Sequence, residues 1–143
     1  MTDYDLAIIG GGIAGSTLGL VMARQGARVL ILEKDRLFRD RVRGETVAPW
    51  GSEEARTLGV YDLLRDRCGI EVPYITFWFG GHAGGRRDLC TTTPHGMGSL
   101  DFKHAEMQEV LLEAARSEGV EVHRGSKCKE RNARATRKRQ LFR

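Results

Sequence analysis

The chain has 143 residues, of which 41% are hydrophobic and 29% charged, a composition typical of one globular domain and not of disordered or fibrous chains. No apolar run approaches the roughly 20 residues of a membrane-spanning helix, and the acidic start MTDYDLAII lacks the features of a secretory signal. The net charge of +4 is uneven, because residues 127–143 carry +7 and residues 1–126 carry −3.

The first predicted unit is a strand, a helix and a second strand. Residues 4–9, YDLAII, predict a strand buried on both faces, because their apolar residues follow one another without alternation. Residues 13–25 predict a helix, and Gly26 stands where glycine commonly ends helices. Residues 28–32 predict a second buried strand. A strand–helix–strand unit of roughly 30 residues indicates a parallel sheet.

The middle of the chain predicts smaller elements. Residues 36–49 are polar and rich in arginine, which predicts a loop, and short helices are expected over 50–58 and 60–66. Residues 71–79 are β-prone and lead through a glycine-rich turn into residues 87–93, a pattern that predicts a hairpin. The large aromatic residues of this part are expected in the core: Trp50, Phe77, Trp78 and Phe79.

The last patterned part of the chain predicts a helix and a strand. Asp101 is expected to cap a helix that ends at Gly119, and residues 120–125 predict the strand. One face of that helix carries apolar residues at helical spacing: Met107, Val110, Leu111 and Ala114. We therefore expect an α/β fold over residues 1–126, Rossmann-like, with a parallel sheet, a small β-meander insertion and a truncated end. Residues 127–143 predict a basic, disordered tail.

A glycine pattern lies between the first predicted strand and helix. Gly10, Gly12 and Gly15 form G-x-G-x-x-G. In this pattern the first glycine permits a tight turn, the second lets the backbone approach a pyrophosphate, and the third lets the helix pack close to the strand. Gly19, about one helical turn later, extends the close packing. The pattern indicates a site for a dinucleotide.

An acidic residue completes this pattern. Glu33 directly follows the second predicted strand, 18 residues after Gly15. A carboxylate at this place accepts hydrogen bonds from the hydroxyls of an adenosine ribose and repels a 2′-phosphate. Lys34 adjoins it, and Ile13 and Ala14 open the helix whose free N–H groups attract phosphate. We expect all four in the cofactor site. The spacing leaves FAD and NAD open as the cofactor.

Three segments, in this order along the chain, carry a family resemblance. They are residues 5–35, which hold the glycine pattern, residues 41–51, RVRGETVAPWG, and residues 104–125, HAEMQEVLLEAARSEGVEVHRG. Together they resemble the N-terminal FAD-binding portion of FAD-dependent monooxygenases of the para-hydroxybenzoate hydroxylase type, a group that also includes halogenases and reductases. The resemblance implies FAD as cofactor and NAD(P)H as the electron donor of a full-length relative.

The resemblance also implies roles for individual residues. The ADP half of FAD would be held by the residues already singled out: Gly10, Gly12, Gly15 and Glu33. Arg41 and Arg43 match arginines that lie along the cofactor, where a guanidinium can pair with phosphate oxygens. His104 stands where the family commonly has Arg or Gln in contact with the cofactor, or it is a polar residue of the first helical turn.

Parts of the family pattern do not occur in this sequence. The family's later Asp-Gly and Gly-Asp motifs hold the pyrophosphate and the ribityl chain, and the sequence contains neither dipeptide. The expectation is a truncated or frame-shifted chain, or an isolated N-terminal piece, that retains the site for the ADP end and lacks much of the site for the flavin ring. No catalytic side chain is identified, which agrees with chemistry carried by a cofactor. The substrate is an unspecified small molecule.

Two other functions remain open at this stage. One is an NAD-dependent dehydrogenase module, and the other is a non-catalytic nucleotide-binding or interaction fragment whose basic tail binds nucleic acid, a reading that we disfavour. The remaining residues that can ligate metals carry no metal-site spacing: Cys68, Cys90, Cys128, His82, His95 and His123. We expect free thiols, surface or structural histidines, no metal, no membrane partner and a cytoplasmic location. The sequence does not specify the oligomeric state.

Overall fold

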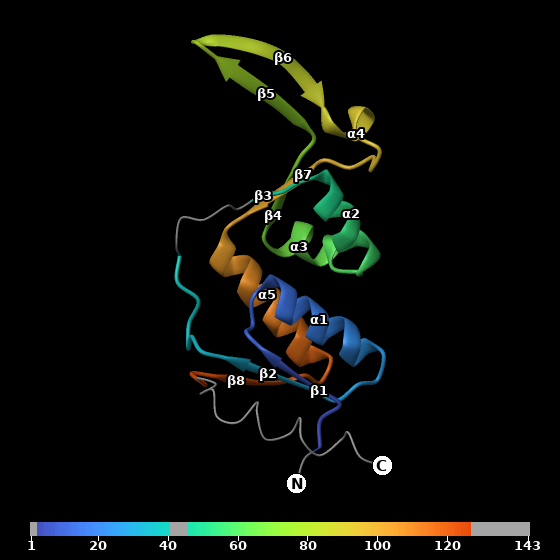
Figure 1. Cartoon of the computed structure of the whole chain (residues 1–143), viewed down its shortest axis with the longest axis vertical. Coiled ribbons are helices and arrows are strands. Elements are labelled where there is room, and N and C mark those ends of the chain that lie inside the picture. The colour runs from blue at the N-terminus through green and yellow to red at the C-terminus, as the bar shows by residue number, and fades with distance from the viewer. Residues whose placement is uncertain (1–2, 41–45, 127–143) are drawn as a thin grey trace, which may run out of the picture.

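A parallel sheet forms the base of the molecule. The computed structural model describes residues 3–40 and 46–126 (Figure 1). The strands β1 (Leu6–Ile9), β2 (Val29–Glu33) and β8 (Glu121–Arg124) lie in the order β1-β2-β8, and both pairings are parallel. Helix α1 (Ile13–Arg24) makes the connection from β1 to β2. The predicted strand–helix–strand unit and its parallel sheet are therefore confirmed.

Two helices cover one face of this sheet. Helix α5 (His104–Ser117) packs beside α1, and both lie on the same side of the strands (Figure 1). Leu20, Ile31 and Leu111 are fully buried between the layers. A Cβ atom at Gly19 would come within 2.8 Å of the Ile31 Cδ1 atom, which confirms the predicted close approach of helix and strand.

The prediction that the first strand is buried on both faces is wrong. The strand begins at Leu6, where Ile8 is 8% exposed but Ile9 is 71% exposed. Side chains alternate across a strand, and within the described residues both helices that cover the sheet lie on one face (Figure 1). Apolar side chains that point to the other face therefore stay exposed.

A second, antiparallel sheet lies next to the helices. It consists of β3 (Thr46–Val47), β7 (Ser99–Phe102) and β4 (Gly69–Val72) in the order β3-β7-β4. The helices α2 (Pro49–Thr57) and α3 (Tyr61–Arg67) confirm the two predicted short helices. All these elements lie between the parallel sheet's helices and the hairpin at the far end (Figure 1).

This second sheet corrects two predictions. The predicted loop over 36–49 contains strand β3, and Asp101 lies within β7 instead of capping the helix, which begins after Lys103. Asp101 pairs with Thr46 on one side and with Ile70 on the other. These pairings join segments far apart in the sequence, so no local pattern predicts them.

The predicted hairpin is present, with different ends. It consists of β5 (Tyr74–Phe79) and β6 (His82–Asp88), and Pro73 separates β5 from β4. The residues after the hairpin form a short helix, α4 (Leu89–Thr92), and not the end of a strand. Asp88 caps that helix, because its Oδ1 atom accepts hydrogen bonds from the backbone N–H groups of Cys90 and Thr91.

The prediction that the large aromatic residues are core residues is wrong. Trp50 is 64% exposed, and Phe77, Trp78 and Phe79 are 50%, 67% and 72% exposed. The hairpin extends away from the body of the molecule, so within the described residues neither of its faces is covered (Figure 1). Aromatic residues favour strands locally, but whether a strand is covered depends on tertiary packing.

Some expectations lie outside the described residues. They concern Arg41, Arg43, Cys128 and the tail over 127–143. In the described part of the chain, no helix is long and apolar enough to cross a membrane.

Candidate functional site

The turn from β1 to α1 is held by a backbone hydrogen bond to β2 and by the side chain of one serine. Gly10 has φ of +102°, a conformation that favours glycine, and its N–H group donates to the Leu32 carbonyl at 2.8 Å. The buried Ser16 hydroxyl donates to the Gly11 carbonyl at 2.9 Å. Ser16 was not singled out from the sequence, although a hydroxyl next to the glycine pattern can bond the turn in this way.

Gly15 is required by the packing of the turn. A Cβ atom at this position would lie 2.0 Å from the Gly10 carbonyl oxygen and 3.1 Å from the Ile8 Cγ2 atom. The first of these atoms is backbone and has little freedom to move. The predicted role of Gly15 in close packing is confirmed.

The N-terminus of α1 is open. Gly12 is the N-cap residue, and within the described chain no side chain caps the helix and its first turn holds no acidic residue. Ile13 and Ala14 of this turn are exposed. Among the described residues other than its two chain neighbours, a Cβ atom at Gly12 would have one neighbour within 4 Å, Gln108 Nε2 at 3.7 Å. The first N–H groups of α1 therefore face accessible space and carry partial positive charge, which suits a phosphate group.

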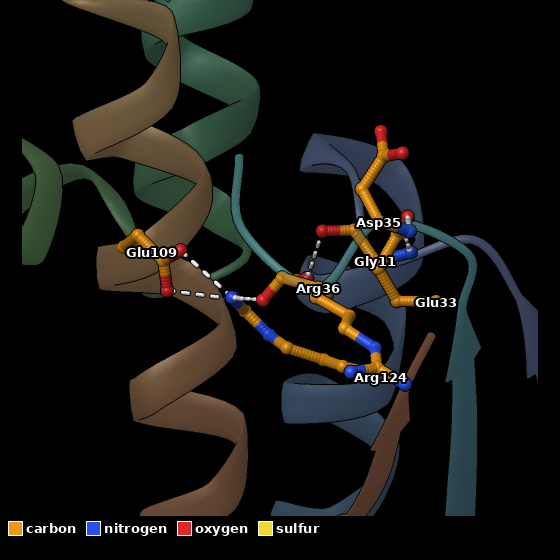
Figure 2. Close-up of polar contacts among 7 residues, drawn as sticks. Gly11, Glu33, Asp35, Arg36, Glu109 and Arg124 are labelled. Atoms are coloured by element: carbon orange, nitrogen blue, oxygen red, sulfur yellow. Dashed lines mark hydrogen bonds and ion pairs between the residues drawn. The ribbon is translucent and has the colours of Figure 1, made fainter. Parts of the chain in front are cut away.

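Glu33 is held at the end of β2 by two backbone donors. The residue is only 5% exposed. Its Oε2 atom accepts a hydrogen bond from the Gly11 N–H group at 2.6 Å, and its Oε1 atom accepts one from the Asp35 N–H group at 2.7 Å (Figure 2). A carboxylate offers about four acceptor positions, so capacity remains for the hydroxyl groups of a ribose.

A polar cavity of about 240 Å³ adjoins this carboxylate, and we name it the β2–α5 cavity. One wall comes from the end of β2 and the loop after it, and the other comes from the first turns of α5. Its lining residues are Glu33, Lys34, Asp35, Phe38, Arg39, His104 and Gln108. The structure thus brings together three residues that the sequence singled out: Glu33, Lys34 and His104.

Gln108 is a site residue that sequence reasoning missed. It follows His104 by four positions, so the two residues share a helix face, and this spacing was the available signal. It lines the β2–α5 cavity and lies near Gly12. Its amide offers a hydrogen-bond donor and an acceptor at this wall of the cavity.

The order of these features fits the ADP half of FAD. The open N-terminus of α1 and the turn with room above Gly12 suit the pyrophosphate. The fixed Glu33 carboxylate comes next and suits the ribose, and the polar cavity beside it suits the adenine. Ile13 and Ala14, the first two residues of α1, also line an apolar cavity of about 460 Å³ between α1, α2 and α3.

The other candidate residues are not part of this arrangement. His95 contacts Glu53, and His123 contacts Glu121. Burial, together with the nearby Glu106 carboxylate, raises the pKa of the Cys68 thiol, the opposite of what activates a nucleophilic cysteine. Within residues 3–40 and 46–126, no group of His, Cys, Asp and Glu side chains is arranged to hold a metal ion.

The fold and the site define a Rossmann-like α/β domain with the glycine turn and acidic residue of dinucleotide-binding proteins. A family model described as "FAD binding domain" matches residues 3–140. The chain therefore belongs to the FAD-binding domain family.

Known proteins agree with this assignment. Squalene epoxidase erg1 of Schizosaccharomyces pombe is 32% identical over 118 residues, a match that covers 65% of this chain and 26% of that protein. The structure of Pseudomonas aeruginosa PqsL in complex with 2-aminobenzoylacetate aligns with a TM-score of 0.72 and 22% identity, over 85% of this chain and 33% of that one.

A second solved structure gives the same fold. The p-nitrophenol 4-monooxygenase PnpA from Pseudomonas putida DLL-E4 aligns with a TM-score of 0.71 and 22% identity, over 84% of this chain and 31% of that chain. The chain thus spans between a quarter and a third of the length of these three proteins. FAD is the cofactor of this family, and the FAD interpretation is favoured over the NAD-dependent dehydrogenase.

Proposed function

We propose that this chain binds FAD by its ADP half and forms the FAD-binding portion of an NAD(P)H-dependent flavin monooxygenase. The observation that carries the proposal is the Glu33 carboxylate, held by the Gly11 N–H group beside the open N-terminus of α1. PnpA is called a monooxygenase and squalene epoxidase erg1 an epoxidase, which supports this class of reaction. An aromatic or similar small molecule is the substrate class that we propose.

In this proposal the chain positions the cofactor. A bound flavin would supply the redox chemistry. The N–H groups of Ile13 and Ala14 would donate to the pyrophosphate, and Glu33 would accept from the ribose hydroxyls. Lys34 and His104, which line the β2–α5 cavity, would contact the adenosine side. Arg41 and Arg43, outside the described residues, would pair with phosphate oxygens.

The test of cofactor binding is direct. The purified full chain is mixed with FAD, freed of unbound ligand, and its visible spectrum and released cofactor mass are recorded. We expect a flavin spectrum and the mass of FAD. A colourless protein that retains NAD and not FAD would contradict the proposal and favour a dehydrogenase.

The test of activity separates binding from turnover. NAD(P)H consumption, peroxide and hydroxylated product are measured with FAD and a panel of phenols. We expect this chain alone to give NAD(P)H oxidation with peroxide and no hydroxylated product, because the sequence contains neither the Asp-Gly nor the Gly-Asp motif that holds the pyrophosphate and the ribityl chain in the family. Hydroxylation coupled to NAD(P)H consumption would contradict this expectation.

We also propose a cytoplasmic location and no nucleic-acid partner. The free thiols of Cys68 and Cys90, which are typical of a reducing compartment, support the first. The second is checked by binding to a DNA duplex at two salt concentrations, where strong salt-dependent binding would contradict it.

A further inference from the structure

Arg124, the last residue of β8, connects the two walls of the β2–α5 cavity. Its side chain is 14% exposed. The Nη1 and Nη2 atoms donate to the two carboxylate oxygens of Glu109 on α5, at 2.9 and 2.6 Å. Nη1 also donates to the carbonyl oxygen of Arg36, in the loop that follows Glu33, at 3.0 Å (Figure 2). One guanidinium thus bonds the helix and the loop together.

The end of β8 holds this loop at further points. The Arg124 guanidinium lies over the Phe38 ring, 4.6 Å from its centroid. The Ser126 N–H group donates to the Glu33 carbonyl at 3.0 Å. Gly125 has φ of +74°, and a Cβ atom there would lie 3.0 Å from the Arg36 Nε atom. The loop is therefore fixed from Glu33 to Phe38.

These contacts join the two walls of the β2–α5 cavity. Phe38 belongs to the loop wall, and Gln108, the neighbour of Glu109, belongs to the helix wall. The fork from Arg124 to Glu109 fixes the separation of these two walls. A two-pronged arginine–carboxylate contact restricts both distance and orientation.

We propose that Arg124, paired with Glu109, is a positioning residue that sets the width of the adenosine cavity and thereby the affinity for adenine nucleotides. The inference rests on the proposed function, because it assigns the β2–α5 cavity to the adenosine end of FAD. Arg124 does not line the cavity and acts through Phe38, Arg36 and Glu109.

The chain contains a matched control for this pair. Arg28 also makes a two-pronged contact with a carboxylate, in which its Nε and Nη2 atoms donate to Asp5 at 3.2 and 3.1 Å. That pair lies at the amino ends of β1 and β2, away from Glu33, and its side chains are 60% and 50% exposed. Arg28→Met removes an arginine fork without touching the cavity.

The test measures ADP binding to the full chain by calorimetry and hydrogen exchange of residues 33–39. We expect Arg124→Met to weaken ADP binding by about tenfold, the size of one lost charged hydrogen bond, and to accelerate exchange in residues 33–39 only. Arg124→Lys should recover part of both effects, because it keeps the charge. Arg28→Met should bind ADP like the wild type.

Either of two results would overturn the inference. It fails if Arg124→Met binds ADP within twofold of the wild type, or if exchange accelerates equally throughout β1 and β2, which indicates general destabilisation. If Arg124→Met does not fold, the more exposed partner Glu109 is changed instead. Glu109→Ala also removes the Arg124–Glu109 contact and should weaken ADP binding by the same factor. If the wild type binds neither ADP nor FAD, the proposed function fails first, and this inference with it.

Discussion

The Gly11 N–H group donates to the Glu33 Oε2 atom at 2.6 Å, across 22 positions of sequence. This hydrogen bond joins the glycine turn after β1 to the end of β2. The turn that we propose as the pyrophosphate site thus also fixes the carboxylate that we propose as the acceptor for the ribose hydroxyls. Both parts of the site are oriented before a ligand arrives, which lowers the entropy lost on binding.

The first prediction concerns Glu33→Ala. We expect FAD affinity to fall by about 1–3 kcal/mol, the scale of hydrogen bonds to a charged group. The free energy of unfolding should fall as well, because the Gly11 and Asp35 N–H groups lose their acceptor in a buried position. Calorimetric titration with FAD and urea unfolding measure the two effects.

Glu121→Gln is the control for that change. Glu121 begins β8, pairs with Leu30 and lies away from the carboxyl end of β2. The control should bind FAD as the wild type does. Unchanged FAD affinity in Glu33→Ala would contradict the assignment of the FAD site to Glu33.

The second prediction separates two glycines of one motif. Gly15→Ala should destabilise the fold by about 1–3 kcal/mol, the usual range for overpacking, because its Cβ atom would lie 2.0 Å from the Gly10 carbonyl oxygen. Gly12→Ala should unfold like the wild type, since Gly12 has φ of −75° and space around it. Thermal unfolding distinguishes the two variants.

FAD affinity should depend on these two glycines in the opposite order, with the larger loss at Gly12. Gly12→Ala, and more strongly Gly12→Val, should lose FAD affinity, because the new side chain occupies the space above the first turn of α1. A Gly12→Val protein that folds and binds FAD normally would show that the pyrophosphate does not approach this turn.

The third prediction is a pH dependence. Hydrogen bonds from the Arg28 side chain, and then from its backbone N–H group, lower the pKa of Asp5. A carboxyl group with a lowered folded-state pKa stabilises the fold above its ordinary pKa of about 4, and this contribution is lost as the pH falls through the lowered value. Asp5→Asn should therefore be less stable than the wild type at pH 7, with a gap that narrows below about pH 4.

Urea unfolding at several pH values checks this sign. Both residues are half exposed or more, so the gap should be small and should shrink in high salt. A gap that widens toward acid pH would contradict the prediction.

The fourth prediction concerns the basic segment. A chain that ends at Ser126 should melt within about 3 °C of the full chain, because the charged sequence after this residue has no apolar periodicity to pack. Limited proteolysis of the full chain should cut first after residue 126. A large drop in melting temperature would show that this segment is docked on the domain.

Local sequence determined the dinucleotide-binding unit. Its strands, helix, glycines and Glu33 lie within about 30 residues, and each signal is a period, a turn residue or a fixed spacing. The structure agrees with these signals because a strand–helix–strand connection in a parallel sheet is almost always right-handed, which leaves one arrangement for the unit. Both the parallel pairing and the place of Glu33 were therefore predictable.

Only the tertiary structure decided what surrounds that unit. Asp101 lies in a strand because distant segments pair with it on both sides, and Ile9 and Trp78 are exposed because, among the described residues, the faces on which they lie are not covered. The cavity beside Glu33 has a second wall from α5, and Arg124 holds that wall in place. Burial and cavity walls depend on contacts between residues distant in sequence, and a single sequence carries no local signal for them.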